Sequence, residues 1–113
     1  MVPEIALTSQ LVHRLEQYFG NQIAVYHSRY SQNERLEVWN HVLNNSQSAR
    51  VIIGARSSVL LPFRDLGLVI VDEEHEQSYK QFDPAPRYHA RDTAIVLSAM
   101  FKAKTLLGSA TPS

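Results

Sequence analysis

The sequence predicts an α/β fold in which a parallel β-sheet is covered by helices on both faces. Two observations lead to this prediction. Segments with strand composition alternate with segments of helical spacing along the 113 residues, and this order is typical of a parallel sheet. The strand segments are also apolar throughout, rather than alternately apolar and polar, as expected for strands buried on both faces.

Helical spacing of apolar residues predicts three helices, over residues 8–19, 31–45 and 88–101. Thr8 or Ser9 is expected to cap the first helix, and Gly20 to end it. The second begins with the Ser-x-x-Glu sequence of a capping box. Trp39 lies on its apolar stripe and is expected in the core.

Four short apolar segments are predicted as strands: "QIAVYHS" (22–28), "ARVIIGA" (49–55), "LGLVIVD" (66–72) and "AKTLLGSA" (103–110). Each strand ends in polar or small residues, at 27–28, 54–57, 72–75 and 108–111. Ligands of parallel sheets bind at the carboxyl ends of the strands. We therefore expect these four clusters to face one edge of the sheet.

Composition limits the possible functions. An apolar content of 44% suits one globular domain, and Lys+Arg equals Asp+Glu at 11 each, so net charge gives no indication of nucleic-acid binding. The absence of cysteine excludes disulfides and thiolate zinc sites. No apolar stretch approaches the roughly 18 residues of a membrane span, and no leader is recognised. We expect a cytoplasmic chain that does not bind membranes.

The acidic cluster "DEEH" at residues 72–75 has two interpretations. Asp72 at a strand tip could hold Mg²⁺ through its waters, and Glu73 could deprotonate an attacking water. Alternatively, the acids occupy the first turn of a following helix, where its dipole stabilises them. The hydroxyls of Ser109 and Thr111 follow a strand expected beside this one. Alone, "SATPS" would be an ordinary turn.

"VDEEH" followed by "GSATPS" resembles motifs II and III of superfamily 2 helicases. The stretches "VPEIALTSQL", "GARSSVLLPFRDLGLVIVDEEHEQSYKQ" and "PRYHARDTA" resemble, in order, the first motor lobe of the bacterial replication-restart helicases. The resemblance covers nearly the whole chain. It implies a RecA-like P-loop NTPase lobe of an ATP-dependent DNA helicase, which couples ATP hydrolysis to movement along single-stranded DNA.

The resemblance also implies roles for individual residues. Asp72 matches the residue that holds Mg²⁺, and Glu73 matches the catalytic base. The positions that couple hydrolysis to movement are His75, Ser109 and Thr111. The positions that meet the DNA backbone are Pro3, Glu4, Gly54, Arg56 and Ser57. Implied cofactors are ATP and Mg²⁺; implied partners are single-stranded and forked DNA, single-stranded DNA-binding protein and primosome proteins.

Residues 79–91 match an aromatic-rich loop that senses DNA. Aromatic and cationic residues are interleaved here, namely Tyr79, Lys80, Phe82, Tyr88 and Arg91. Stacked bases contribute about 1–3 kcal/mol each on such aromatics, and the cations can hold phosphates. The alternatives are that Tyr79 and Tyr88 pack on the sheet and that Arg91 pairs with Glu76. For Arg56, the alternative is a salt bridge to Asp65 or Glu4.

The phosphate-binding sequence G-x-x-x-x-G-K-[ST] does not occur in these 113 residues. The resemblance places it upstream of Met1, and places a second lobe, with the arginine that completes the ATP site, beyond Ser113. The family's zinc-binding cysteines are also missing. We therefore expect residues 1–113 to be a partial lobe from a longer chain, without ATP hydrolysis of its own. Its last strand would be an exposed edge, through which two chains could dimerise.

Two other classes of function remain as alternatives. A stand-alone interaction module could keep a helicase-like sheet without ATPase activity. A metal-dependent hydrolase built on "DEEH" would need further ligands from other strand tips, and only His27 is offered.

Overall fold

The computed structural model of this chain describes residues 1–3, 6–27, 30–72, 80–81 and 88–108. The three predicted helices are present as α1 (Ser9–Phe19), α2 (Gln32–Leu43) and α3 (Ala90–Met100). The four predicted strands are β1 (Ile23–Tyr26), β2 (Val51–Gly54), β3 (Leu68–Val71) and β6 (Lys104–Leu107). Unpredicted elements are the short strands β4 (Lys80–Gln81) and β5 (Tyr88–His89), and the 3₁₀ turns η2 (Gly20–Gln22), η3 (Gln47–Ala49) and η4 (Arg56–Leu60).

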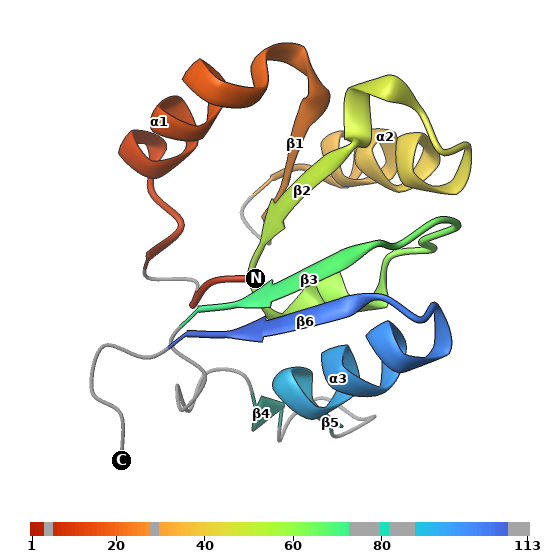
Figure 1. Ribbon diagram of the computed structural model, residues 1–113. Helices are drawn as coiled ribbons and strands as arrows, with labels where there is room; N and C mark the ends of the chain where they lie inside the picture. The colour runs from red at the N-terminus through yellow and green to blue at the C-terminus, as the bar shows by residue number, and fades with distance from the viewer. Residues whose placement is uncertain (4–5, 28–29, 73–79, 82–87, 109–113) are drawn as a thin grey trace.

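The main strands form two parallel pairs, which confirms the predicted fold class. β1 pairs with β2, with Ile23 opposite Val51, and β3 pairs with β6, with Leu68 opposite Lys104. Figure 1 shows the arrows of β2, β3 and β6 pointing toward the same side of the molecule. The carboxyl ends of these strands therefore share an edge, as the sequence predicted.

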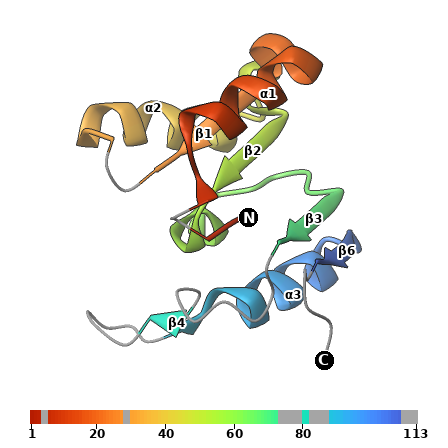
Figure 2. The same ribbon diagram turned by 90° about the vertical axis from the view of Figure 1, so that its left-hand side faces the viewer.

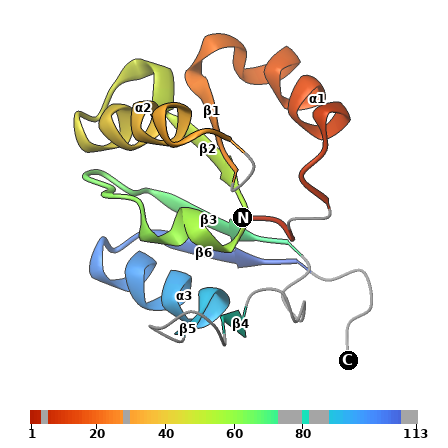
Figure 3. The same ribbon diagram turned by 180° about the vertical axis from the view of Figure 1, so that it is seen from behind.

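The first residues of the chain connect the two strand pairs. The Val2 N–H donates to the Gly54 carbonyl at 3.0 Å. The Met1 amine donates to the Ile70 carbonyl at 2.5 Å, and the Asp72 N–H donates to the Met1 carbonyl at 2.9 Å. This is the hydrogen-bond pattern of a parallel strand, so Met1 acts as one strand residue between β2 and β3. Figures 1 and 3 show the N-terminus at this place from opposite sides.

Local capping explains where the helices begin and end. The Thr8 side chain accepts a hydrogen bond from the Leu11 N–H at 3.2 Å, and Gly20 ends α1 with a φ of 60°, which glycine adopts without steric cost. The Ser31 hydroxyl accepts from the Glu34 N–H at 3.2 Å at the start of α2. Both predicted caps are confirmed.

Two clusters of buried side chains hold the elements together. α3 packs on β3 and η4 through Val59, Val71, Ala90 and Ala94. α2 packs near β1 and β2 through Val38, Val42 and Leu61. Figure 2 shows this division, with α1, α2, β1 and β2 in the upper part and α3, β3 and β6 in the lower part.

The prediction that Trp39 lies in the core is wrong. Its side chain is 38% exposed, and the buried residues of α2 are Val38 and Val42. These two valines lie one turn apart and pack toward Leu61 and the β1–β2 pair. Trp39 lies beside that stripe, where it lines a shallow pocket with Tyr26.

Burial on both faces also does not hold for the β3–β6 pair. Leu68 and Ile70 of β3 are 54% and 46% exposed, and all four residues of β6 are exposed. Val69 and Val71 alternate with them and pack on the α3 cluster. The apolar side chains of β3 are therefore buried on one face only.

None of the helices within the described ranges has the length and hydrophobicity needed to cross a bilayer.

Candidate nucleotide and nucleic-acid site

Asp72 lies at the carboxyl end of β3, beside the end of β6. The Gly108 N–H donates to the Val71 carbonyl at 2.8 Å. A Cβ atom built on Gly108 would lie 3.1 Å from Asp72 Oδ1. The exposed carboxylate therefore adjoins the point where the chain enters residues 109–111. The predicted approach of the "DEEH" strand to the "GSATPS" strand is confirmed by this pairing.

Several predicted site residues fall outside the described part of the chain. They are Glu4, Glu73, His75, Tyr79, Phe82, Ser109 and Thr111. Their roles remain predictions from the sequence.

A single exposed carboxylate fits the way proteins bind Mg²⁺, because this ion takes one or two carboxylates and keeps several waters. A side chain at position 108 would crowd this carboxylate, and glycine avoids that contact. Across residues 1–3, 6–27, 30–72, 80–81 and 88–108, no three His, Asp or Glu side chains converge as a metal site. His27 is buried, with its ring centroid 5.9 Å from that of Tyr30. The described residues thus lend no support to a hydrolase that needs several converging ligands.

Four of the five residues predicted to meet the DNA backbone, all but Glu4, lie in the described part of the chain, at or near the end of β2. Pro3 follows Val2, whose N–H binds the Gly54 carbonyl, and Arg56 and Ser57 open η4 directly after β2. Pro3 and Gly54 are buried, whereas Arg56 and Ser57 are half-buried. Of these four residues, only Arg56 and Ser57 are partly exposed to solvent.

Packing alone requires a glycine at position 54. A Cβ atom there would lie 2.6 Å from Ser58 Cβ and 2.9 Å from the Tyr26 carbonyl oxygen. Ser58 itself is fixed, because its hydroxyl donates to the Ala55 carbonyl at 2.6 Å. Close approach of η4 to the end of β2 therefore explains this glycine independently of any ligand.

The chain before α3 turns back on itself as a short antiparallel pair. Lys80 lies opposite His89 and Gln81 lies opposite Tyr88. This pairing places the backbones of Lys80 and Tyr88, both predicted to contact DNA, on adjacent strands at the start of α3. Neither strand was predicted, since two residues give no detectable periodicity.

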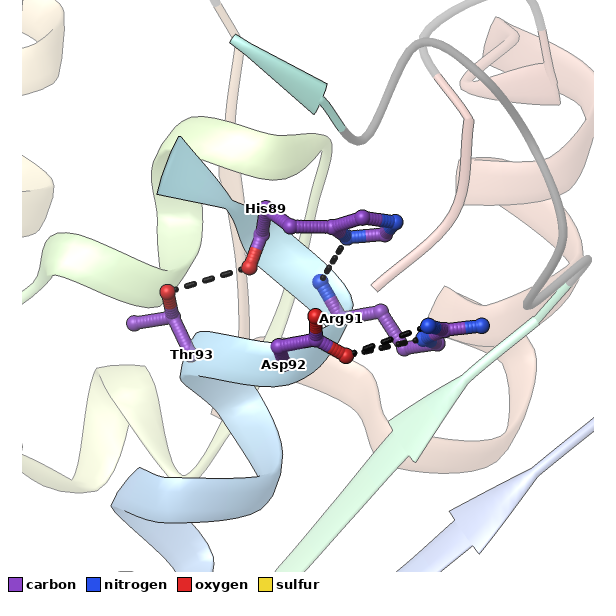
Figure 4. Close-up of polar contacts among 4 residues, drawn as sticks. All are labelled: His89, Arg91, Asp92 and Thr93. Atoms are coloured by element: carbon purple, nitrogen blue, oxygen red, sulfur yellow. Dashed lines mark hydrogen bonds and ion pairs between the residues drawn. The ribbon is translucent and has the colours of Figure 1, made fainter. Parts of the chain in front are cut away.

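The first turn of α3 fixes the backbone around Arg91. The Arg91 N–H donates to His89 Nδ1 at 3.2 Å, and the Thr93 hydroxyl donates to the His89 carbonyl at 3.0 Å (Figure 4). The Arg91 guanidinium forms an ion pair with Asp92 at 3.1 Å. These roles of His89 and Asp92 were not predicted from the sequence. A polar residue directly before a helix, with an acid in its first turn, is the signal that could have identified them.

The amino group of Met1 lies near the carboxyl end of β3, where it donates to the Ile70 carbonyl. Burial lowers the pKa of this ammonium from its usual 8.0, and the carboxylate of Asp72 partly opposes that change. In the 113-residue chain on its own, the Asp72 carboxylate is therefore electrostatically linked to this amino group.

Comparison with known proteins adds an independent finding. The sequence model of the DEAD/DEAH box helicase family matches residues 1–113. Similar curated proteins are each named replication restart protein PriA. The chain is 45% identical to that of Bacillus subtilis (strain 168), 44% to that of Synechocystis and 49% to that of Haemophilus influenzae, over all 113 residues. It spans only 14%, 13% and 15% of those proteins.

Proposed function

Because this chain belongs to the DEAD/DEAH box helicase family, we propose that it is part of the first motor lobe of an ATP-dependent DNA helicase. The parent protein remodels stalled replication forks and restarts replication. The relatives that carry the name replication restart protein support this proposal. The structural observation that carries it is the exposed carboxylate of Asp72 at the end of β3, beside the glycine that opens "GSATPS".

In this proposal, Asp72 and Glu73 divide the chemistry of ATP hydrolysis. Asp72 would hold Mg²⁺ through water, and the bound ion would supply charge neutralisation at the phosphate oxygens. Glu73 follows it in the chain and takes a proton from the water that attacks the terminal phosphate. Asp72 directly follows β3, and its main-chain N–H donates a hydrogen bond to the Met1 carbonyl, which holds its backbone in place.

Coupling of hydrolysis to movement is assigned to His75, Ser109 and Thr111. These residues continue from the ends of the two paired strands, β3 and β6. We propose that a change at the phosphate passes between the ends of these two paired strands.

Single-stranded DNA is proposed to contact two groups of residues. The first is Pro3, Glu4, Gly54, Arg56 and Ser57, of which the last three lie at and directly after the end of β2. The second is Tyr79, Lys80, Phe82, Tyr88 and Arg91, around the β4–β5 pair. Half-buried Arg56 and Arg91 supply charge for phosphates, and aromatic side chains supply stacking surfaces. Further proposed partners are forked DNA, single-stranded DNA-binding protein and primosome proteins, in the bacterial cytoplasm.

The decisive test is DNA-stimulated ATP hydrolysis by the longer parent protein. Glu73→Gln should abolish turnover while ATP binding and DNA binding remain, because the amide cannot accept the proton. Glu74→Gln removes the neighbouring charge without removing the base, and should keep most turnover. Unchanged turnover in Glu73→Gln would refute the assigned chemistry. A wild-type parent with no DNA-stimulated hydrolysis would instead favour a helicase-like interaction module.

The 113-residue chain alone should show no DNA-stimulated hydrolysis, because its sequence holds no G-x-x-x-x-G-K-[ST] loop to bind the phosphates. Hydrolysis that Glu73→Gln stops in this chain would contradict that expectation.

A further inference from the structure

A shallow pocket, here called the α2 pocket, lies between α2 and the end of β1. Its volume is about 320 Å³, and its lining consists of Tyr26 from β1 and Gln32, Arg35, Leu36 and Trp39 from α2. The four helix residues are spaced so that they share one face of α2. Figures 1 and 3 show this helix beside the β1–β2 pair.

Two apolar side chains of α2 line this pocket and lie outside the core. Leu36 is 56% exposed and Trp39 is 38% exposed. The buried face of the helix is instead formed by Val38 and Val42. Tyr26 of β1 is half-buried. The α2 pocket therefore offers an indole and a phenol, which are surfaces on which planar rings stack.

The same pocket contains a buried cationic donor. Arg35 Nε is buried and has no hydrogen-bond partner among the described residues. The neighbouring acids of α2 have other partners. The Glu34 carboxylate accepts from the Ser31 hydroxyl at 3.2 Å, and Glu37 lies 3.9 Å from His41. Buried donors are normally satisfied, and a guanidinium donates best to a carboxylate or a phosphate. The pocket thus combines stacking surfaces with a donor for an anion.

The position of the α2 pocket relates it to the residues predicted to meet the DNA backbone. Tyr26 is the last residue of β1 and lies opposite Gly54, the last residue of β2. Arg56 and Ser57 follow Gly54 at the start of η4. Neighbouring strands lie about 4.8 Å apart. The pocket therefore begins one strand away from these residues, at the same edge of the sheet.

We propose, on the basis of the DNA-binding function proposed above, that the α2 pocket holds one nucleotide of single-stranded DNA. Its base stacks on Trp39, with Leu36 and Tyr26 at its sides, and a phosphate oxygen accepts a hydrogen bond from Arg35 Nε. The shared edge with Gly54 favours a nucleotide over an acidic peptide, because a strand that passes Arg56 reaches the pocket next. Stacking of this kind accepts any base.

The test measures binding of fluorescein-labelled oligothymidine to the longer parent protein by fluorescence anisotropy. Trp39→Leu and Arg35→Gln should each raise Kd roughly fivefold or more, because each removes one stacking or charge-assisted contact. Trp39→Phe should keep most of the affinity, because its ring still stacks. Circular dichroism verifies that each variant is folded.

Arg50→Gln is the matched control for the loss of an arginine. Arg50 directly precedes β2, at the edge of the sheet opposite the pocket, and its Nε already donates to Gln47 at 3.2 Å. This variant should change Kd little. A loss of affinity equal to that of Arg35→Gln would overturn the specific role of Arg35.

A strand of the same length made of abasic deoxyribose phosphates separates base stacking from phosphate binding. Arg35→Gln should weaken the binding of both strands by a similar factor. Trp39→Leu should weaken the binding of oligothymidine more than that of the abasic strand. Equal weakening of the two strands by Trp39→Leu would overturn the stacking assigned to Trp39.

The remaining outcomes separate this inference from the proposed function. Unchanged DNA binding by Trp39→Leu and Arg35→Gln would overturn the pocket as a DNA site, and weaker binding by Arg91→Ala in the same assay would leave the proposed function standing. A parent that binds no single-stranded DNA would overturn both. An acidic peptide, acetyl-Glu-Asp-Leu-Phe-Glu-amide, should not compete with DNA. Competition that Arg35→Gln abolishes would assign the pocket to a protein partner and overturn the proposal.

Discussion

Replacing Gly54 with alanine should destabilise the fold in the absence of any ligand. The added Cβ would lie 2.6 Å from Ser58 Cβ and 2.9 Å from the Tyr26 carbonyl oxygen. Neither neighbour moves easily, since Tyr26 belongs to β1 and the Ser58 hydroxyl is bonded to the Ala55 carbonyl. The substitution therefore overpacks the junction of β1, β2 and η4.

The expected cost follows from the number and kind of these contacts. One extra carbon in a well-packed site costs about 1–3 kcal/mol, and a backbone oxygen among the contacts favours the upper half. For a chain of this size, that upper half, about 2–3 kcal/mol, corresponds to a fall in Tm of roughly 8–12 °C. Urea unfolding followed by circular dichroism measures the free energy directly.

Gly67→Ala is the matched control. No atom lies within 4 Å of a Cβ built at Gly67, and its φ is not positive. This change should be neutral or stabilise by about 0.4–1 kcal/mol, since alanine restricts the unfolded chain. Adding Ser58→Gly to Gly54→Ala should recover part of the loss, because it removes the 2.6 Å contact but leaves that to Tyr26. Equal stability of the two single alanine variants would refute the packing explanation for Gly54.

Three further predictions concern charge and capping. In the 113-residue chain on its own, the pKa of the Met1 ammonium is lowered from 8.0, so the unfolded state holds more protons than the folded state just below pH 8. The free energy of unfolding should rise with pH there and level off above it, and N-terminal acetylation should remove this rise from urea midpoints measured from about pH 6 to 9. Ser31→Ala removes the α2 cap and should cost about 1 kcal/mol in urea unfolding, whereas Asn40→Ala, exposed in the same helix, should cost nothing. In the longer parent, Arg91→Ala should weaken single-stranded DNA binding in fluorescence anisotropy, and Asp92→Asn, which breaks the ion pair, should strengthen it; weakening by both would assign the pair a structural role.

Local patterns in the sequence were sufficient to predict the caps and the main elements. Thr8, Gly20 and Ser31 act through hydrogen bonds or backbone angles within a few residues of their own positions. Their roles can therefore be predicted from the local sequence. The parallel pairing of β3 with β6 needed only the order of strands and helices.

Contacts between distant residues were less predictable. The apolar positions of α2 define more than one possible stripe, and only packing against Leu61 selects Val38 and Val42 over Trp39. Likewise, the sequence around Met1 does not indicate that this residue pairs with β3, because a single strand residue has no periodicity.

The position of Asp72 illustrates how both kinds of information combine at the candidate site. The sequence places an acid after an apolar strand, but the backbone around it is held from two sides in the structure. On one edge the Asp72 N–H is bonded to Met1, and on the other the Val71 carbonyl is bonded to Gly108. A carboxylate that follows a strand end fixed on both edges needs little reorganisation to meet a charged ligand. Both bonds are made by main-chain atoms, so only a substitution that removes one of them, such as Gly108→Pro, should loosen Asp72 and weaken ligand binding before it changes the reaction itself.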